Sequence, residues 1–344
     1  MQFPSIPSCK HVAVSQKGTL GIITLSRPEA LNATSYEMVL AINDALTQFA
    51  VNSSVKHIAV RSSSDRSFCA GGDIRSAYYA MQNKDYAACE LYFKAEYQLI
   101  HRLATFEKPI YAFINGYCFG GGMGLSVHCT SRIVGENAVF SMPETRIGFF
   151  PDIGAAYFYN QLKDSNEAML LACTGYRFKR DHAMLNGIAT HAVDSYQWDT
   201  LLNQLADGEK LDTCSYVSAE VKDAAINTDM LLAFSKPNLP EIIKALPHSF
   251  KDILNQQSPF SIAVTYAYMK RAQGMSLKSV LELDFVLAMN FVKHGEFMEG
   301  VRALVIDKDK KPKWSFPWTE NVFEVMPYHI IDTMFVFDET QLYS

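Results

Sequence analysis

Short apolar runs and longer amphipathic stretches alternate along the first half of the chain. The apolar runs are rich in β-branched and aromatic residues and predict strands, at residues 11–14, 20–25, 55–60, 109–114, 132–134, 138–140 and 189–193. The amphipathic stretches repeat apolar residues every three or four positions and predict helices, at about 32–49, 86–103, 168–173 and 180–186. Strands that alternate with helices in this way indicate an α/β core.

Local signals add detail to these elements. The runs at 11–14 and 20–25 are joined by a turn that contains Gly18 and predict a hairpin, and the runs at 132–134 and 138–140 predict a further short pair. Asn32 or Thr34 can cap the first helix.

The pattern changes after about Ser195, where strand signals fade and helical periodicity dominates. Helices are predicted at 198–205, 218–226, 242–245, 261–272 and 277–292. We therefore expect two regions, an α/β core over residues 1–195 and a helical C-terminal region over residues 196–344 that packs on it.

The composition narrows the range of partners. Of 344 residues, 49% are hydrophobic and 19% are charged, and the formal net charge is −5. This balance offers no basic surface for nucleic acid, and no apolar run is long enough to cross a bilayer. We expect neither nucleic acid nor a membrane as a partner.

The cysteines and the first residues bear on the compartment. None of the seven cysteines forms a C-x-x-C pair and their number is odd, so we expect neither a disulfide framework nor a zinc site, and we expect a reducing compartment. Residues 1–7 lack the features of a secretory signal or a transit peptide. The expected location is the cytoplasm if the source is bacterial and the mitochondrial matrix if it is eukaryotic.

Two glycine-rich stretches each follow a predicted strand and precede a predicted helix. The first contains Gly71 and Gly72, and the second runs over residues 120–124. Glycines let the backbone approach a ligand, and the first N–H groups of a helix have no partner within it. Two such turns can direct two N–H groups at one point, as in an oxyanion hole for acyl chemistry. For either turn alone, close packing of helix on strand explains the glycines equally well.

The motifs Ala70-Gly-Gly-Asp-Ile74, Gly120-Gly-Gly122 and Met142-Pro-Glu-Thr145 occur in this order along the chain. They resemble the enoyl-CoA hydratase/isomerase (crotonase) superfamily. With Phe149-Phe-Pro-Asp152 and the stretch 299–314, the chain looks like the 3-hydroxyisobutyryl-CoA hydrolase branch, and the resemblance covers about residues 14–314.

The resemblance implies a crotonase-like core of repeated ββα units with a C-terminal helical region. It implies an acyl-CoA thioester as substrate, with no separate cofactor or metal, because coenzyme A is part of the substrate. It implies that the thioester oxygen lies between the N–H groups of Gly72 and Gly121. The residues it implies in substrate binding are Gly71, Asp73, Ile74, Glu96 and Gly120.

The acidic residues distinguish branches of the superfamily. By resemblance, hydratases use one glutamate soon after the glycine turn and another in a later loop. Here the later one is Glu144, but Gly124 occupies the first position, and Asp152 stands where hydratases tend to have glycine. Because water addition across a double bond then lacks one acid/base partner, hydrolysis is favoured. We expect Glu144 to be the general base or the nucleophile, and Asp152 to orient the substrate hydroxyl or the attacking water.

Simpler roles exist for each acidic residue. Glu96 can be an ordinary carboxylate on a helix surface, and Glu144 and Asp152, which both follow proline, can be turn residues. With the resemblance, catalysis is the favoured reading of Glu144.

Three other functions fit the same fold. They are an enoyl-CoA hydratase or isomerase, a non-catalytic protein that binds CoA esters, and an RNA-binding protein. Gly124 counts against the hydratase, the intact glycines and carboxylates count against a non-catalytic protein, and the lack of a basic stripe counts against RNA binding. By resemblance we also expect a homo-oligomer such as a trimer, and a place in valine catabolism.

Overall fold

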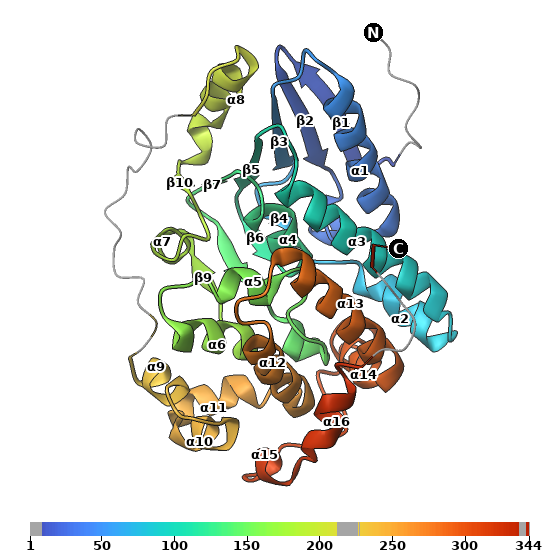
Figure 1. The fold of residues 1–344 in the computed structure, drawn as a ribbon, viewed down its shortest axis with the longest axis vertical. Coiled ribbons are helices and arrows are strands. Elements are labelled where there is room, and N and C mark those ends of the chain that lie inside the picture. Colours follow the sequence, from blue (N-terminus) through green and yellow to red (C-terminus); the bar gives the residue numbers. More distant parts are fainter. Residues whose placement is uncertain (1–8, 212–225, 227, 337–341, 344) are drawn as a thin grey trace. The chain divides into compact units, whose positions relative to one another are not determined.

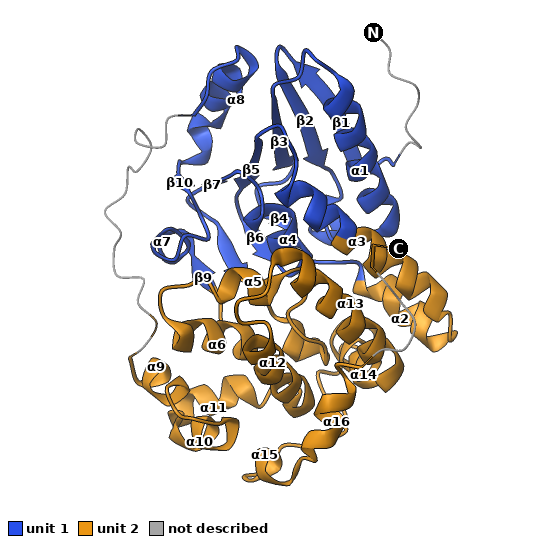
Figure 2. Ribbon diagram, viewed as in Figure 1, with its two compact units in different colours: residues 1–73, 98–140, 178–224 blue, residues 74–97, 141–177, 225–344 orange. Residues whose placement is uncertain are grey.

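The computed structural model describes residues 9–211, 226, 228–336 and 342–343 (Figure 1). The chain forms two compact units, each built from three separate segments (Figure 2). Unit 1 comprises residues 1–73, 98–140 and 178–224, and unit 2 comprises residues 74–97, 141–177 and 225–344. Unit 1 contains nearly all of the strand residues, whereas the described part of unit 2 is built mainly from helices.

Unit 1 is organised around a six-stranded sheet in the order β1-β2-β3-β5-β7-β10. The pair β1–β2 is the predicted antiparallel hairpin, and every other neighbouring pair is parallel. Parallel strands are covered on both faces, so they are continuous apolar runs, and all five residues of β5 are buried. The strands are β1 (Val12–Lys17), β2 (Leu20–Leu25), β3 (His57–Ser62), β5 (Ile110–Ile114), β7 (Ser131–Val134) and β10 (His191–Ala192).

A second sheet contains four short strands in the order β4-β6-β8-β9. They are β4 (Ser67–Cys69), β6 (Tyr117–Phe119), β8 (Val139–Ser141) and β9 (Phe178–Lys179). The predicted pairing of residues 132–134 with 138–140 is wrong, because β7 belongs to the larger sheet and β8 to the smaller one. Strands this short show no clear alternation of apolar and polar residues, so the sequence does not predict this sheet.

Helix α1 (Tyr36–Val51) packs on the β1–β2 hairpin in unit 1 (Figure 1). A Cβ atom on Gly21 of β2 would come within 2.8 Å of the Phe49 ring, so glycine allows this close approach. The helix is capped by Ser35, whose side chain accepts a hydrogen bond of 3.3 Å from the N–H of Met38. The prediction that Asn32 or Thr34 caps α1 is therefore wrong.

Helix α8 (Trp198–Ala206) covers one face of the six-stranded sheet. Its leucines pack in one cluster with apolar residues of the strands, which include Leu20, Ala59, Tyr111, Phe113 and Ile133. The ring of Trp198 meets Phe113 edge to face at 5.4 Å, and its indole N–H donates to the carbonyl of Val193 at 3.0 Å. The remaining helices of unit 1 are α4 (Gly121–Val127) and α7 (Arg180–Leu185), while α3 (Tyr86–Ala104) passes from unit 2 into unit 1 after Tyr97.

Unit 2 has a core rich in aromatic side chains. The rings of Phe149 and Phe297 lie 4.5 Å apart, and those of Phe150 and Phe291 stack at 5.5 Å. The helices that supply or surround this core are α2 (Ile74–Gln82), α5 (Ala155–Tyr159), α6 (Ser165–Thr174), α9 (Thr228–Phe234), α10 (Leu239–Ala245), α11 (His248–Leu254), α12 (Pro259–Arg271), α13 (Leu277–His294), α14 (Glu296–Val301), α15 (Val322–Val325) and α16 (Tyr328–Thr333).

Every secondary-structure element from Ser195 onward in the described residues is helical. The helix predicted at 218–226 lies outside the described residues except for Ile226. The division into residues 1–195 and 196–344 stays a prediction. In the part of the chain that the structure describes, no helix is both long enough and apolar enough to span a membrane.

Candidate active site

The first glycine turn, Gly71–Gly72, follows β4 in unit 1 and is held by neighbouring backbone. The N–H of Thr34 donates to the carbonyl of Gly71 at 2.9 Å, and the N–H of Asp73 donates to the carbonyl of Thr34 at 2.8 Å. Arg27 donates to the carboxylate of Asp73 at 2.9 Å. No backbone hydrogen bond from the N–H of Gly72 is found among the described residues, so this donor remains available.

Asn32 holds the strand that leads into the same turn through side-chain hydrogen bonds. Its side chain is fully buried, and its amide donates to the carbonyls of Ser67 and Phe68 at 3.2 and 3.0 Å. Asn32 and Thr34, which the sequence suggested as helix caps, therefore hold the strand and the turn that present Gly72. A buried polar side chain whose bonds are satisfied fixes its neighbours in one arrangement.

The second glycine turn lies beside the first within unit 1. Strands β4 and β6 are parallel neighbours with Cys69 opposite Cys118, so the turns that follow them leave the same edge of the sheet. A Cβ atom built on Gly71 would lie 4.0 Å from the backbone nitrogen of Gly121. Gly121 is the first residue of α4, with Gly120 as its N-cap, so its N–H has no acceptor within the helix.

Gly122 is required where α4 crosses β4. A Cβ atom at this position would lie 2.1 Å from the carbonyl oxygen of Cys69, and backbone cannot move aside as a flexible side chain can. We expect Gly122→Ala to lower the free energy of unfolding by about 1–3 kcal/mol, measured by urea denaturation. The volume-conserving Met123→Leu at the next, also buried, residue is the control. Equal urea midpoints for Gly122→Ala and the parent would contradict the close contact.

Three predicted acidic residues are buried together in unit 2. Glu96 lies on α3, Glu144 begins a short 3-10 helix that ends at Ile147, and Asp152 lies in the loop before α5; their exposed fractions are 5%, 8% and 6%. Burial raises the pKa of Glu144 well above its usual value, and the charges of Asp152 and then Glu96 raise it further. The structure therefore brings Glu96, Glu144 and Asp152 into one electrostatic cluster.

Asp152 accepts a hydrogen bond from a tyrosine that the sequence did not predict as a site residue. Burial raises the pKa of Asp152 to about 7, while the hydroxyl of Tyr97 donates to Oδ2 at 2.7 Å and opposes that rise. Tyr97 and Glu96 occupy the buried stripe of α3 with Phe93 and Ile100. A polar group at such a position in a helical pattern was the available signal for both residues.

A second missed residue is Tyr159 of α5. It is fully buried, its hydroxyl has no hydrogen-bond partner among the described residues, and the charge of Glu144 contributes to its raised pKa. The Oε2 atom of Glu144 is also buried and has no partner there. Because buried polar groups are almost always hydrogen-bonded, these two atoms mark a place where a polar group of a ligand or a water can bind.

These buried carboxyl groups predict a pH-dependent stability. The unfolded chain releases the Asp152 proton near pH 4 and the folded chain near pH 7, so the folded state binds more protons within this window. Stability should therefore fall as the pH rises from 4 to 7, by on the order of 3 kcal/mol from this group, and then level off. Urea unfolding between pH 5 and 8 measures this slope, and Asp152→Asn should flatten it. An equally steep curve for that variant would contradict the assignment.

The predicted glycines and their neighbours divide between the two units. Gly71, Gly72, Asp73, Gly120 and Gly121 lie together in unit 1, while Ile74 begins α2 in unit 2. Burial raises the pKa of Cys129 to about 12, and Cys69, Cys118 and Cys173 are likewise buried, so these four cysteines act as small apolar side chains. Within the described residues, no group of histidine, cysteine, aspartate and glutamate could hold a metal ion.

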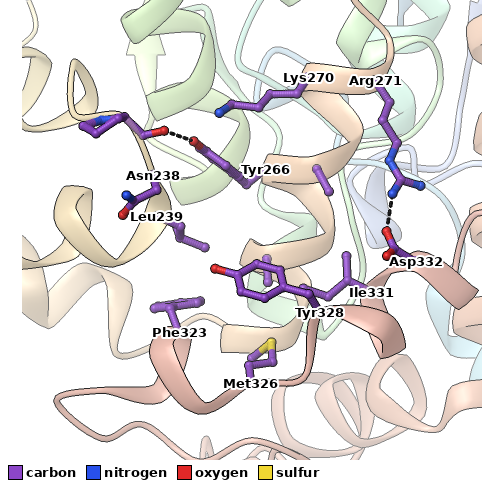
Figure 3. Close-up of a pocket in the computed structure, with 13 residues that line it drawn as sticks. Asn238, Leu239, Tyr266, Lys270, Arg271, Phe323, Met326, Tyr328, Ile331 and Asp332 are labelled. Carbon is purple, nitrogen blue, oxygen red and sulfur yellow. Dashed lines mark hydrogen bonds and ion pairs between the residues drawn. The ribbon is translucent and has the colours of Figure 1, made fainter.

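Unit 2 also contains a largely apolar pocket of about 340 Å³ between α12 and the C-terminal helices α15 and α16 (Figure 3). The hydroxyl of Tyr266 donates to the carbonyl of Pro237 at 3.1 Å, and Arg271 is paired with Asp332. None of the predicted site residues lines this pocket.

Comparison with known proteins agrees with this architecture. The model of the enoyl-CoA hydratase/isomerase family matches residues 20–331. The crystal structure of an enoyl-CoA hydratase from Rhodobacter sphaeroides is 28% identical, with a TM-score of 0.82 over 94% of this chain and 97% of that one. That of a carnitinyl-CoA dehydratase from Mycobacterium thermoresistibile is 24% identical, with a TM-score of 0.85 over 97% and 98%, and it bears on the fold alone. The predicted crotonase-like fold is confirmed.

Relatives that match this sequence over most of its length carry the name of the hydrolase branch. The mitochondrial 3-hydroxyisobutyryl-CoA hydrolase of Gallus gallus is 33% identical over 336 residues, which cover 90% of this chain and 87% of the relative. The protein of the same name from Homo sapiens is 33% identical over 328 residues, which cover 89% and 84%. The resemblance to the hydrolase branch is thus confirmed, and the chain belongs to the enoyl-CoA hydratase/isomerase family.

Proposed function

We propose that this protein is an enzyme that hydrolyses the thioester of a short 3-hydroxyacyl-CoA, such as 3-hydroxyisobutyryl-CoA, to the free acid and coenzyme A. The observation that carries the proposal is the buried cluster of Glu144, Asp152 and Glu96, in which Glu144 has a raised pKa and a carboxyl oxygen without a partner. A buried carboxyl group with a raised pKa is suited to move a proton during catalysis.

The chemistry requires one bond to form and one to break. In the base route, Glu144 takes a proton from water as the water oxygen bonds to the thioester carbon, and the C–S bond then breaks to release coenzyme A, whose sulfur takes up a proton. In the nucleophile route, Glu144 bonds to that carbon first, coenzyme A leaves, and water cleaves the resulting anhydride. Both routes pass through a negatively charged tetrahedral oxygen.

The N–H groups of Gly72 and Gly121 are proposed to stabilise that oxygen. They come from adjacent turns of unit 1, and neither is used by the surrounding backbone of the described residues. Preorganised donors of this kind act most strongly where charge develops. We further propose that Asp152 orients the substrate hydroxyl or the attacking water, and that Glu96, Gly71, Asp73, Ile74 and Gly120 contribute to substrate binding.

The substrate class is supported by the name 3-hydroxyisobutyryl-CoA hydrolase, which the relatives from Gallus gallus, Danio rerio and Homo sapiens share. Gly124 lies buried inside α4 and carries no acid, which disfavours the hydratase chemistry named for the solved structure from Rhodobacter sphaeroides. The mechanism uses no cofactor beyond the coenzyme A of the substrate. A role in valine catabolism, a homo-oligomeric state, and a mitochondrial location if the source is eukaryotic belong to the same proposal.

A thiol-release assay across a panel of acyl-CoA esters tests the function. We expect release of coenzyme A from 3-hydroxyisobutyryl-CoA and 3-hydroxypropionyl-CoA, and much slower release from butyryl-CoA, which lacks the hydroxyl. Hydration of crotonyl-CoA without thiol release would instead identify a hydratase. Binding of the esters without turnover would identify a non-catalytic protein.

A further inference from the structure

A fourth buried carboxyl group lies on α13 of unit 2. Asp284 is fully buried, and it shares the apolar stripe of that helix with Val280, Leu281, Phe285 and Ala288. A carboxyl group at such a position costs free energy unless its oxygens are hydrogen-bonded. Its partners therefore indicate what it does.

One oxygen of Asp284 bonds to the backbone just after Asp152, and the other bonds to Tyr268, which itself bonds to that backbone. The N–H of Gly154 donates to Oδ2 at 2.7 Å. The hydroxyl of Tyr268 donates to Oδ1, and the oxygen of the same hydroxyl accepts the N–H of Ala156 at 3.4 Å. Asp284 and Tyr268 thus hold two backbone N–H groups, at Gly154 and Ala156, that lie only two and four residues beyond Asp152.

The held segment has an unusual backbone. Ile153 has φ = +54° and Gly154 has φ = +79°, so two consecutive residues are left-handed. This conformation is costly for a β-branched residue such as isoleucine and persists only where the surroundings enforce it. The turn directs Asp152 so that its Oδ2 accepts the hydroxyl of Tyr97 at 2.7 Å.

We propose that Asp284 is a positioning residue for the reaction, which holds the strained Ile153–Gly154 turn so that Asp152 stays bonded to Tyr97 and close to Glu144. The inference rests on the proposed function, because it gives Asp284 a catalytic effect only through Asp152. It also accounts for a carboxyl group on an otherwise apolar face of α13. Burial and then the charge of Asp152 raise the pKa of Asp284, while the hydrogen bonds from Tyr268 and Gly154 lower it.

Two substitutions separate positioning from packing. Asp284→Asn keeps an oxygen that accepts the Gly154 N–H and gains an NH₂ group that can donate to the Tyr268 hydroxyl oxygen, so we expect kcat within about threefold of the parent. Asp284→Leu keeps the branched shape of the side chain but removes both bonds, and we expect kcat to fall about 10- to 100-fold with a smaller change in KM. Equal losses in the two variants would overturn the proposal, because the hydrogen bonds would then not matter.

A double-mutant cycle tests the route through Asp152. If Asp284 acts by placing Asp152, then Asp284→Leu should cost less than about threefold when Asp152 is already replaced by Asn. A loss in that background as large as in the parent would overturn the proposal. Should Asp284→Leu not fold, Tyr268→Phe, which leaves the Gly154 bond intact, takes its place in the same cycle with an expected loss of about 2- to 10-fold.

Amide hydrogen exchange distinguishes this proposal from the proposed function. The Gly154 amide loses its acceptor in Asp284→Leu, and the Ala156 amide loses its acceptor in Tyr268→Phe. Each should then exchange at least about tenfold faster than in the parent. Asp284→Asn should leave them protected. Hydrogen exchange can be measured without any enzymatic activity. A parent that releases no thiol would refute the proposed function, while exchange would still report on the hydrogen bonds to Gly154 and Ala156. Unchanged exchange at Gly154 and Ala156 in these variants would overturn the proposal that Asp284 and Tyr268 hold this turn.

Discussion

Glu144→Gln should lower the rate of thiol release at saturating substrate by about a thousandfold or more. The amide can neither accept the proton of the attacking water nor attack the thioester carbon, so both proposed routes lose their central group. Because the substitution is nearly isosteric, KM should change little. The measurement is kcat with 3-hydroxyisobutyryl-CoA, and Glu107→Gln, at an exposed position, is the matched control. Near-normal activity of Glu144→Gln would remove Glu144 from the mechanism.

The same variant should be more stable than the parent at pH 8. The folded protein penalises ionisation of Glu144 through burial and through the charges of Asp152 and Glu96, and glutamine removes that penalty. We expect a gain of about 1–2 kcal/mol that shrinks toward pH 4, where glutamate is protonated in both states. A variant that is inactive and also less stable would instead indicate that Glu144 supports the fold.

Oxygen labelling separates the two routes that Glu144 can follow. In a single turnover in ¹⁸O-labelled water, the base route places the label only in the product acid. In the nucleophile route, water can attack the Glu144 carbon of the anhydride, so label would appear in the Glu144 carboxyl group, where mass spectrometry of the peptide detects it.

Gly121→Pro should lower kcat by about 10²–10³-fold, because it removes one of the two proposed N–H donors to the tetrahedral oxygen. Gly121 is the first residue of α4, and this is the helical position that accepts proline best, so the helix should survive. Gly121→Ala is the matched control, since it adds a side chain but keeps the N–H. A loss in the alanine variant equal to that in the proline variant would show that space, and not the donor, is what the position provides.

The sequence predicted the larger elements of the fold better than the smaller ones. Strands such as β3 and β5 are long apolar runs, and α3 was predicted to begin at Tyr86 and end within a residue of its observed end. The four-stranded sheet was missed because its strands have only two or three residues.

The candidate site also contains features that the sequence predicts and others that it does not. Glycine placement suggested two N–H groups at one point, but the adjacency of the turns depends on the pairing of β4 with β6, which no local pattern reveals. Glu144 and Asp152 emerged only through resemblance, because Pro-Glu and Pro-Asp are common in turns. Tyr97, Tyr159 and Asp284 lie far apart in sequence, and tertiary packing brings them to Asp152, Glu144 and Gly154 respectively. Each polar group on an apolar helix face was nevertheless a usable signal.

The burial of Cys69, Cys118, Cys129 and Cys173 has a practical use at the bench. A colorimetric disulfide reagent that detects free coenzyme A reacts with accessible thiolates, and these four side chains are shielded while the chain is folded. Once urea opens the protein, the same reagent gains access to them. Above the constant signal of the partly exposed Cys9, one chemical probe can therefore follow turnover under native conditions and the loss of structure as denaturant is added.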